Sequence, residues 1–428
     1  MLATILTGAL LACGSSKNPA PPPPPPATPN FANTVFIGDS LAAGFQNGSL
    51  LDTQQPHGWA ALFAQQANAA ITLPLIAPPG APAVMELVSV GPPPVVTTAS
   101  GTTSGRDNPS QQPTDLAVPG HHLHDLINAA PTAVPTSNED IITTLVLGFP
   151  TGNTNTQLQE AIALKPSALV VWIGSNDALI ADSTGMPSSM TPLASFTTDF
   201  TQLMSTLHSQ SSATLIVANL PDVTAIPYLT PSATVLAEAS TQSGVPAAQL
   251  GTELGLAAGD LVTAHGLSEV QAALKAIAGG QTPTPLDEAG VLTAAEVQQV
   301  QALEDQYNQV IAQQTAAVGG TLIDMHAFFQ KLSAGITINN VNATTGYLGG
   351  LFSLDGIHPT NTGYALVANQ FIDTINASLK TTFADVNVSA IASTDPLFGP
   401  NIKPTASGTH ISAEAGERAG LLLRRRSR

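Results

Sequence analysis

Thr34-Val-Phe-Ile-Gly-Asp-Ser-Leu-Ala-Ala-Gly44 is the stretch that decides the fold of this chain. An apolar run of strand length ends at Gly38-Asp39-Ser40, and small, helix-compatible residues follow it. The pattern predicts a buried strand over residues 34–38, a sharp turn and the start of a helix. Ser40 then lies beyond the carboxyl end of a strand, where open α/β sheets bind their ligands. Ser40 is therefore a candidate nucleophile, although Asp and Ser in a turn more often cap a helix or form an Asx-turn.

Later segments repeat the order of strand followed by helix. The capping box Thr293-Ala-Ala-Glu296 opens the clearest helix, which Gly319-Gly320 ends. Strands that alternate with helices predict a parallel sheet in a protein of the α/β class. The further predicted strands are residues 168–173, 213–218 and 321–325, and the further helices are 58–67, 196–209 and a last one that ends near Leu379.

Polar or flexible residues follow the other short apolar segments. Asn176 comes just after the strand at 168–173, and its side-chain N–H groups could face a developing oxyanion; a turn asparagine is the alternative. Gly120 closes the segment that begins at Asp115, where it either brings its N–H close to a ligand or forms an ordinary turn. The cluster His121-His122-Leu-His124-Asp125 matches no established zinc spacing, so we expect no metal there and instead a solvated helix start.

Asp355 and His358 are three residues apart on a loop that precedes the last long helix. At that spacing a carboxylate can hold one imidazole nitrogen, which leaves the other nitrogen free to face a serine. A serine hydroxyl is a weak nucleophile and needs such a base within hydrogen-bond reach.

Four blocks of this sequence, in order, resemble the conserved blocks of the SGNH hydrolases, also called the GDSL esterase/lipase family. The blocks are Gly38-Asp-Ser-Leu41, Gly120, Gly174-Ser-Asn-Asp177 and Asp355-Gly-Ile-His358. The resemblance implies a three-layer α/β/α sandwich with a flavodoxin-like parallel sheet. It also implies Ser40 as nucleophile, His358 as general base and Asp355 as the residue that orients it, with an oxyanion hole from Ser40 N–H, Gly120 N–H and Asn176. Neither a metal nor an organic cofactor is implied.

Two stretches exceed what a minimal member of that family needs. Residues 74–113 are rich in Pro, Gly, Thr and Ser and read as a surface insertion with room for a hairpin. Residues 223–290 form an Ala- and Gly-rich insertion, for which a cover over the site is favoured over an extension of the core. The hydrolase domain is expected over residues 31–383, and residues 384–428 are expected to form an irregular tail.

The amino terminus carries signs of export. Residues 1–12 are apolar and precede Cys13, the single cysteine, in a pattern that resembles a bacterial lipoprotein signal with cleavage before a lipidated cysteine. The segment has no Lys or Arg, so an ordinary signal peptide or a buried thiol are alternatives. Residues 13–30 include a run of prolines that predicts an extended tether. The expected location is the bacterial cell envelope, with the protein anchored by lipid and facing the periplasm or the surface, or otherwise secreted.

The composition of the chain limits the kinds of partner that it is expected to bind. The formal charge is −17, and the body of the chain is acidic while arginines gather in the last eleven residues. Such a body repels phosphate backbones, so nucleic acid is not an expected partner. The expected function is hydrolysis of a carboxylic ester of a small molecule, lipid or glycan. The alternative is a surface-anchored module that binds glycan or lipid without turnover.

Overall fold

The computed structural model describes residues 29–91 and 94–404. Cys13, the signal-like segment, most of the proline-rich tether and the arginine-rich end lie outside these residues. At the centre is a parallel sheet with the strand order β1-β4-β5-β9, in which Thr34 pairs with Ala168 and Ile216 pairs with Thr321. The four strands are β1 (Thr34–Gly38), β4 (Ala168–Trp172), β5 (Thr214–Ala218) and β9 (Thr321–Ile323).

A fifth segment, residues 114–118, extends along the free edge of β1. The N–H of Phe36 donates to the carbonyl of Thr114 at 2.9 Å, and the N–H of Leu116 donates back to the carbonyl of Phe36 at 2.9 Å. With this segment the sheet has the order 2-1-3-4-5, which is the flavodoxin-like arrangement. The predicted fold class is confirmed.

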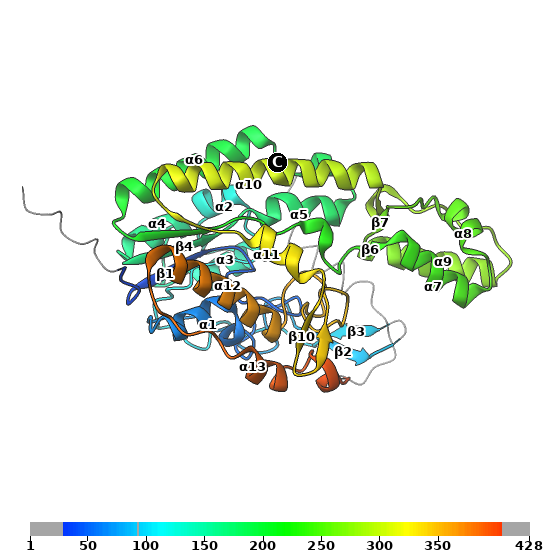
Figure 1. Ribbon diagram of the computed structural model, residues 1–428, viewed down its shortest axis with the longest axis horizontal. Coiled ribbons are helices and arrows are strands. Elements are labelled where there is room, and N and C mark those ends of the chain that lie inside the picture. Colours follow the sequence, from blue (N-terminus) through cyan, green and yellow to red (C-terminus); the bar gives the residue numbers. More distant parts are fainter. Residues whose placement is uncertain (1–28, 92–93, 405–428) are drawn as a thin grey trace, which may run out of the picture.

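Helices cover both faces of the sheet and make three layers (Figure 1). On one face Phe196 stacks on Tyr307 at 4.1 Å, which joins α6 (Leu193–Gln210) to α10 (Ala294–Ala317). The other face is covered by α1 (Trp59–Gln66) and α12 (Asn361–Leu379), whose Trp59 and Phe371 rings stack at 4.0 Å. Aromatic pairs of this kind contribute beyond the apolar area that they bury, so they fix the two outer layers on the sheet.

Side-chain caps start the two longest of these helices, and the cap of α10 lies at the predicted Thr293. Thr293 accepts from the N–H of Glu296, while the carboxylate of Glu296 accepts from the N–H of Thr293. Thr360 accepts from the N–H of Gly363 and starts α12 just after the loop that carries His358. Each cap satisfies N–H groups that have no partner within the helix.

Both long insertions have structure of their own. The first holds an antiparallel hairpin of β2 (Met85–Ser89) and β3 (Val95–Thr98), as its apolar run allowed. The second forms a lobe that extends away from the sheet (Figure 1), with a separate small core that includes Leu250 and Leu254. Its elements are α7 (Ser232–Ser243), α8 (Ala247–Leu254), α9 (Ala264–Ala278) and the short strands β6 (Thr230–Pro231), β7 (Leu261–Val262) and β8 (Val291–Leu292).

Two local predictions are wrong. The residues after Ser40 make a single turn rather than a helix, because the chain turns away at Gly44, whose φ is +70° and whose backbone packs against Gly58. Residues 384–404 are not irregular throughout: α13 (Val388–Thr394) forms there, and Phe398 is buried in a cluster with Phe352.

The remaining elements are short. No helix in the described part of the chain combines the length and the apolarity that a membrane span requires. These elements are α2 (Leu123–Asn128), α3 (Asn138–Leu147), α4 (Gln157–Ala163), α5 (Ser175–Thr184), α11 (Met325–Leu332), β10 (Ile336–Ile338) and β11 (Val341–Ala343).

Candidate active site

Ser40 stands at the carboxyl end of β1, where the backbone is tightly packed. A Cβ on Gly38 would come within 2.1 Å of the carbonyl oxygen of Trp172, so only glycine fits before the turn. The N–H of Asp39 donates to that same carbonyl at 3.3 Å. The close approach of the two strands therefore fixes the direction in which Ser40 leaves the sheet.

The structure brings together Ser40, His358 and Asp355. The hydroxyl oxygen of Ser40 lies 2.7 Å from Nε2 of His358, and Nδ1 of His358 lies 3.0 Å from Oδ2 of Asp355. All three side chains are buried, and the ring of Phe45 packs against the imidazole at 4.7 Å. This is the geometry of a serine with a base within reach and a carboxylate that orients the base.

Asp355 is held in its ionised form. Burial works to raise the pKa of Asp355, but the charge of His358 and hydrogen bonds from the N–H groups of Ile357 and His358 outweigh it and lower the pKa. A further N–H, from Gly48, donates to Oδ2 at 2.7 Å. An ionised carboxylate at this place fixes the imidazole tautomer with its proton on Nδ1 and leaves Nε2 able to accept a proton.

A turn near Ser40 fastens the loop that carries the histidine. Asn47 makes two hydrogen bonds to that loop, each 3.0 Å long. Its N–H donates to Ser353 Oγ, and its Oδ1 accepts from the N–H of Leu354. The hydroxyl of Tyr364 donates to the carbonyl of Phe45 at 2.8 Å. The sequence interpretation missed these residues; the only signal was Asn47-Gly48, a typical turn pair, and both residues have positive φ.

Asn176 lies in the first turn of α5 and lines the same pocket as Ser40. Its Nδ2 donates to the carbonyl of His121 at 2.8 Å, which fixes the direction of the amide. Gly120, the residue before His121, has a φ of +84° but is not among the residues that line the pocket. Thus the predicted Gly120 and Asn176 segments are joined directly, through the main chain of His121.

His121 is buried rather than solvated. Its Nε2 lies 2.8 Å from Thr143 Oγ1, and Gln157 Nε2 lies 2.9 Å from its Nδ1. Burial lowers the pKa of His121 to about 4, so the ring is neutral at physiological pH. Because Gln157 Oε1 also accepts from the N–H of Gly38 at 3.0 Å, this chain of contacts links the end of β1 to the segment at Gly120.

His122 is also buried, and its pairing with Asp125 caps α2. The expectation of a solvated helix start is therefore wrong for His121 and His122. Within the described ranges, the group of three residues whose ligand atoms lie within 4.8 Å of one another is His265, Glu269 and Asp287, which lies in the lobe, outside the pocket.

Asp39 lies beside the site but does not contact the imidazole by a hydrogen bond. Its Oδ1 accepts from the N–H of Leu41 at 3.0 Å, while its buried Oδ2 has no hydrogen-bond partner among the described residues. Burial raises the pKa of Asp39 to about 7, in contrast to Asp355. The two carboxylates thus have different environments, and only Asp355 holds His358.

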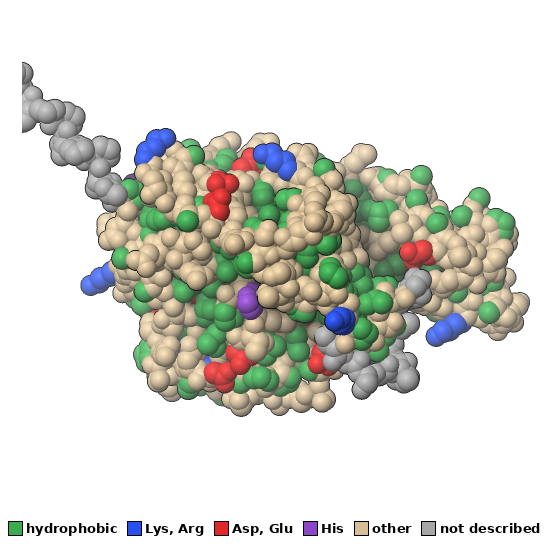
Figure 2. Space-filling model, turned by 60° about the horizontal axis from the view of Figure 1, so that its bottom comes forward, with side chains coloured by type: hydrophobic (Ala, Val, Ile, Leu, Met, Phe, Trp, Pro, Cys, Tyr) green, Lys and Arg blue, Asp and Glu red, His purple; other side chains and the backbone are tan. Residues whose placement is uncertain are grey.

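The pocket above Ser40 has a volume of about 160 Å³. Its walls come from the segment 221–226, from α11 and from the loop with His358, and they are largely apolar, with Phe329, Phe352 and Ile357 among them. Val223, Ala225 and Ile226, at the start of the insertion expected over 223–290, line the pocket, whereas the helices of the lobe do not, so the expected cover does not extend to the lobe. On the face of the molecule drawn in Figure 2, the Lys and Arg side chains of the described residues are separated from one another and form no basic patch.

Comparison with known proteins identifies the family. The model of the GDSL-like lipase/acylhydrolase family matches residues 34–371, and the chain belongs to this family. Family membership supports ester hydrolysis as the general reaction. No curated protein matches the chain in sequence.

Among solved structures, the chain is similar to an acetylxylan esterase from Geobacillus stearothermophilus at 13% identity and a TM-score of 0.37. The match covers 82% of this chain and 98% of that chain. A lipase/acylhydrolase from Enterococcus faecalis has 13% identity, 83% and 100% coverage and a TM-score of 0.34. Similarities of this size say nothing about the substrate.

Proposed function

We propose that this protein is a carboxylic ester hydrolase in which Ser40 is the nucleophile, His358 the general base and Asp355 the residue that orients the base. The single observation that supports this most is the unbroken chain of contacts from Ser40 Oγ to His358 Nε2 and from His358 Nδ1 to Asp355. A module that only binds its ligand has no need of a nucleophile, a base and an orienting carboxylate in contact.

The reaction then runs in two halves. Ser40 Oγ attacks the carbonyl carbon of the ester while its proton passes to His358 Nε2. The tetrahedral intermediate collapses as His358 returns that proton to the departing alcohol, which leaves an acyl group on Ser40. Water attacks this acyl group as His358 takes its proton, and the second tetrahedral intermediate collapses as His358 returns the proton to Ser40 Oγ, which releases the acid.

In this proposal, the negative charge on the carbonyl oxygen is met by the N–H of Ser40, the N–H of Gly120 and the side chain of Asn176. The bond from Asn176 to the His121 carbonyl supports this role, because it uses one amide hydrogen to orient the group and leaves the second for the oxyanion. Loss of one such donor typically costs about a hundredfold or more in kcat.

The test is hydrolysis of p-nitrophenyl acetate and butyrate by the protein without residues 1–28. We expect turnover by the wild-type protein and a loss of at least ~10³-fold in Ser40→Ala, because only weak catalysis survives removal of a nucleophile. His208→Ala, a substitution at an exposed position of α6, is the matched control. Equal rates for wild type and Ser40→Ala would contradict the proposal.

We further propose that Cys13 carries lipid and that residues 13–30 tether the enzyme in the bacterial cell envelope. The support is the order of apolar segment, cysteine, proline run and folded domain in the sequence. Mass spectrometry of the mature amino terminus tests it: a diacylglyceryl mass on Cys13 is expected, and an unmodified residue 13 would contradict it.

A further inference from the structure

One face of α11 borders the pocket. Four residues on this side line the pocket together with Ser40, namely His326, Phe329, Gln330 and Ser333. The last three follow His326 by three, four and seven positions. Residues at these intervals share one side of a helix. This side combines an aromatic ring with several hydrogen-bonding groups.

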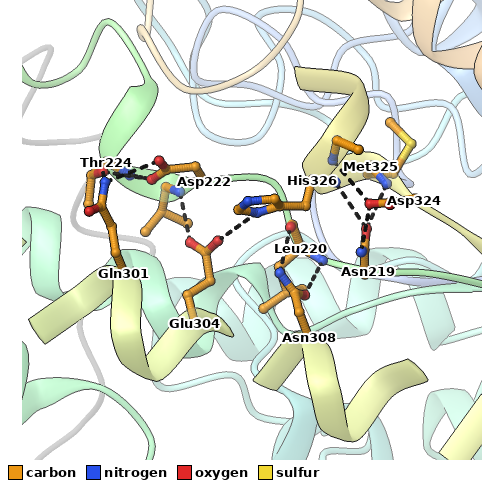
Figure 3. Close-up of polar contacts among 12 residues, drawn as sticks. Asn219, Leu220, Asp222, Thr224, Gln301, Glu304, Asn308, Asp324, Met325 and His326 are labelled. Carbon is orange, nitrogen blue, oxygen red and sulfur yellow. Dashed lines mark hydrogen bonds and ion pairs between the residues drawn. The ribbon is translucent and has the colours of Figure 1, made fainter. Parts of the chain in front are cut away.

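The adjoining wall, residues 220–224, is fastened to one side of α10 (Figure 3). Asn308 bonds to both the N–H and the carbonyl of Leu220, at 2.8 and 3.0 Å. Glu304 accepts from the N–H of Val223 at 2.9 Å. The wall around His326 is therefore a fixed surface rather than a loose loop.

Glu304 also fixes His326. Its Oε1 lies 3.4 Å from Nδ1 of His326, and the carboxylate is 1% exposed whereas the imidazole is 33% exposed. Nδ1 is thus turned to the buried acid. Nε2, on the other edge of the ring, has no hydrogen-bond partner in the part of the chain that the structure describes, and is available to a molecule in the pocket.

The protonation of this pair makes Nε2 a donor at neutral pH. The contact with Glu304 raises the pKa of His326 to about 8, helped by the charges of Asp222 and Asp305, while burial raises the pKa of Glu304 to about 7. At neutral pH the Glu304–His326 pair holds two protons in all. If both are on the imidazole of His326, Nε2 carries a hydrogen. If one is on Glu304, the imidazole keeps the other, and that hydrogen lies on Nε2 because Nδ1 faces the protonated acid. When the pair loses a proton, Nδ1 keeps the remaining one and Nε2 becomes an acceptor.

We propose that His326 Nε2 donates a hydrogen bond to an ether or hydroxyl oxygen that the substrate carries beyond its ester group, and that Glu304 positions His326 for this contact. The ring of Phe329, on the same side of α11, offers apolar surface to the carbon atoms next to that oxygen. His326 thereby determines specificity, in favour of oxygen-bearing esters over alkyl esters of equal size. This inference rests on the proposed function.

The test uses two pairs of isosteric esters that differ by one oxygen. 2-Methoxyethyl acetate against butyl acetate probes the alcohol side, and ethyl 3-methoxypropionate against ethyl pentanoate probes the acyl side. The readout is the ratio of kcat/KM within a pair, from which effects of pH that are common to both esters cancel. We expect a ratio of about 10 at pH 7 for one pair, since a neutral-to-charged hydrogen bond contributes on the order of 1.5 kcal/mol.

His326→Leu removes the donor, so we expect its ratio to fall to about 1. His326→Gln keeps an N–H near the position of Nε2 and should retain part of the preference. The wild-type ratio should fall as pH rises through 8, whereas the ratio of His326→Gln should not change with pH. In Glu304→Gln the midpoint of this fall should move below 8, a shift that a merely structural role would not produce. His208→Leu, far along α6, is the control.

An unchanged ratio in His326→Leu for both pairs would overturn the role of His326 and leave the proposed function intact. Failure of the wild-type protein to hydrolyse any of the four esters would instead contradict the proposed function, and this inference with it.

Discussion

Asp39 and Asp355 are buried carboxylates near the same imidazole, yet their environments oppose each other. Asp355 receives several N–H donors and contacts His358, so its pKa is lowered. Asp39 has one oxygen bonded to Leu41 and one without a partner in the described structure, so burial dominates and its pKa rises to about 7. Asp39 supports the turn that presents Ser40, and Asp355 holds the imidazole of His358.

This difference predicts the effect of substitution. Asn in place of Asp39 keeps an oxygen for the Leu41 N–H and removes a charge that the site does not solvate, so Asp39→Asn should keep kcat/KM within about tenfold of wild type. Asp355→Ala and His358→Ala should each lose roughly 10²–10⁴-fold, because the base is then misoriented or absent. Hydrolysis of p-nitrophenyl butyrate measures all three. A larger loss in Asp39→Asn than in Asp355→Ala would reverse the assignment.

At this scale the sequence predicted the residues whose motifs are short and local. Asp355 and His358 are three positions apart, and Ser40 follows a short strand whose five residues are all buried. Each of these two motifs could therefore be recognised from a short stretch of sequence. Asn47 and Tyr364 were not, because their partners lie more than 300 positions away along the chain. Likewise, nothing in the local pattern shows that Glu304 and His326 meet, since they belong to different helices.

Among the elements, the strands were easiest to predict and α5 the hardest. Every residue of β1 and β4 is buried, and the sheet strands read as largely continuous apolar runs. Residues 175–183 of α5 are also all buried, but they include Asn176, Asp177 and Asp182, so neither helical periodicity nor apolarity marks them. The helix at 388–394 was missed for a related reason: the cluster in which it packs includes Phe352 and Leu332, which are far from it in sequence.

The lobe formed by α7, α8 and α9 has its own core, and this predicts a separate response to damage. Leu254→Ala should destabilise the lobe by roughly 2–5 kcal/mol, as large-to-small core substitutions do. Amide hydrogen exchange should then speed up in α7–α9 while hydrolysis of p-nitrophenyl acetate stays within about twofold. Leu203→Ala, equally buried in α6 within the main core, is the matched control and should lower the stability of the whole domain. Parallel loss of activity in Leu254→Ala would show that the lobe shapes the pocket.

Over the whole molecule, several buried acids bind protons more tightly in the folded state. Burial raises the pKa of Asp39 and Glu304 to about 7 and that of Asp115 to about 8, and it raises Asp182 well above its usual range. Unfolding returns the pKa values of these carboxyl groups to about 4. At a pH between about 4 and the raised pKa values, the folded chain therefore binds more protons than the unfolded chain. Stability must therefore fall as pH rises from about 4 to 8.

His326 acts in the same direction, because its raised pKa adds stability below pH 6.5 that is lost through pH 8. His121 opposes the trend, since its lowered pKa costs stability as pH falls below 6.5. Asp125 and Asp355 have lowered pKa values and lose their contribution only in acid, through about pH 2 in the case of Asp125.

We therefore expect the melting temperature to be higher at pH 5.5 than at pH 8.5, by at least ~3 °C. Asp115→Asn keeps an acceptor for the N–H of Ala117 but cannot ionise, so it should raise the melting temperature more at pH 8.5 than at pH 5.5. Calorimetry at the two pH values measures both effects. A protein that is more stable at pH 8.5 would show that the buried acids do not govern its stability.

The wide separation of Ser40 from its base has a consequence for the order of events during synthesis. Ser40 and His358 are 318 positions apart, and Asn47 and Tyr364 join the same two ends of the chain. During translation, Ser40 leaves the ribosome long before residues 353–364 are synthesised. The nascent chain therefore carries Ser40 without its histidine partner for most of its translation, and any chain that stops before this loop lacks both His358 and Asp355.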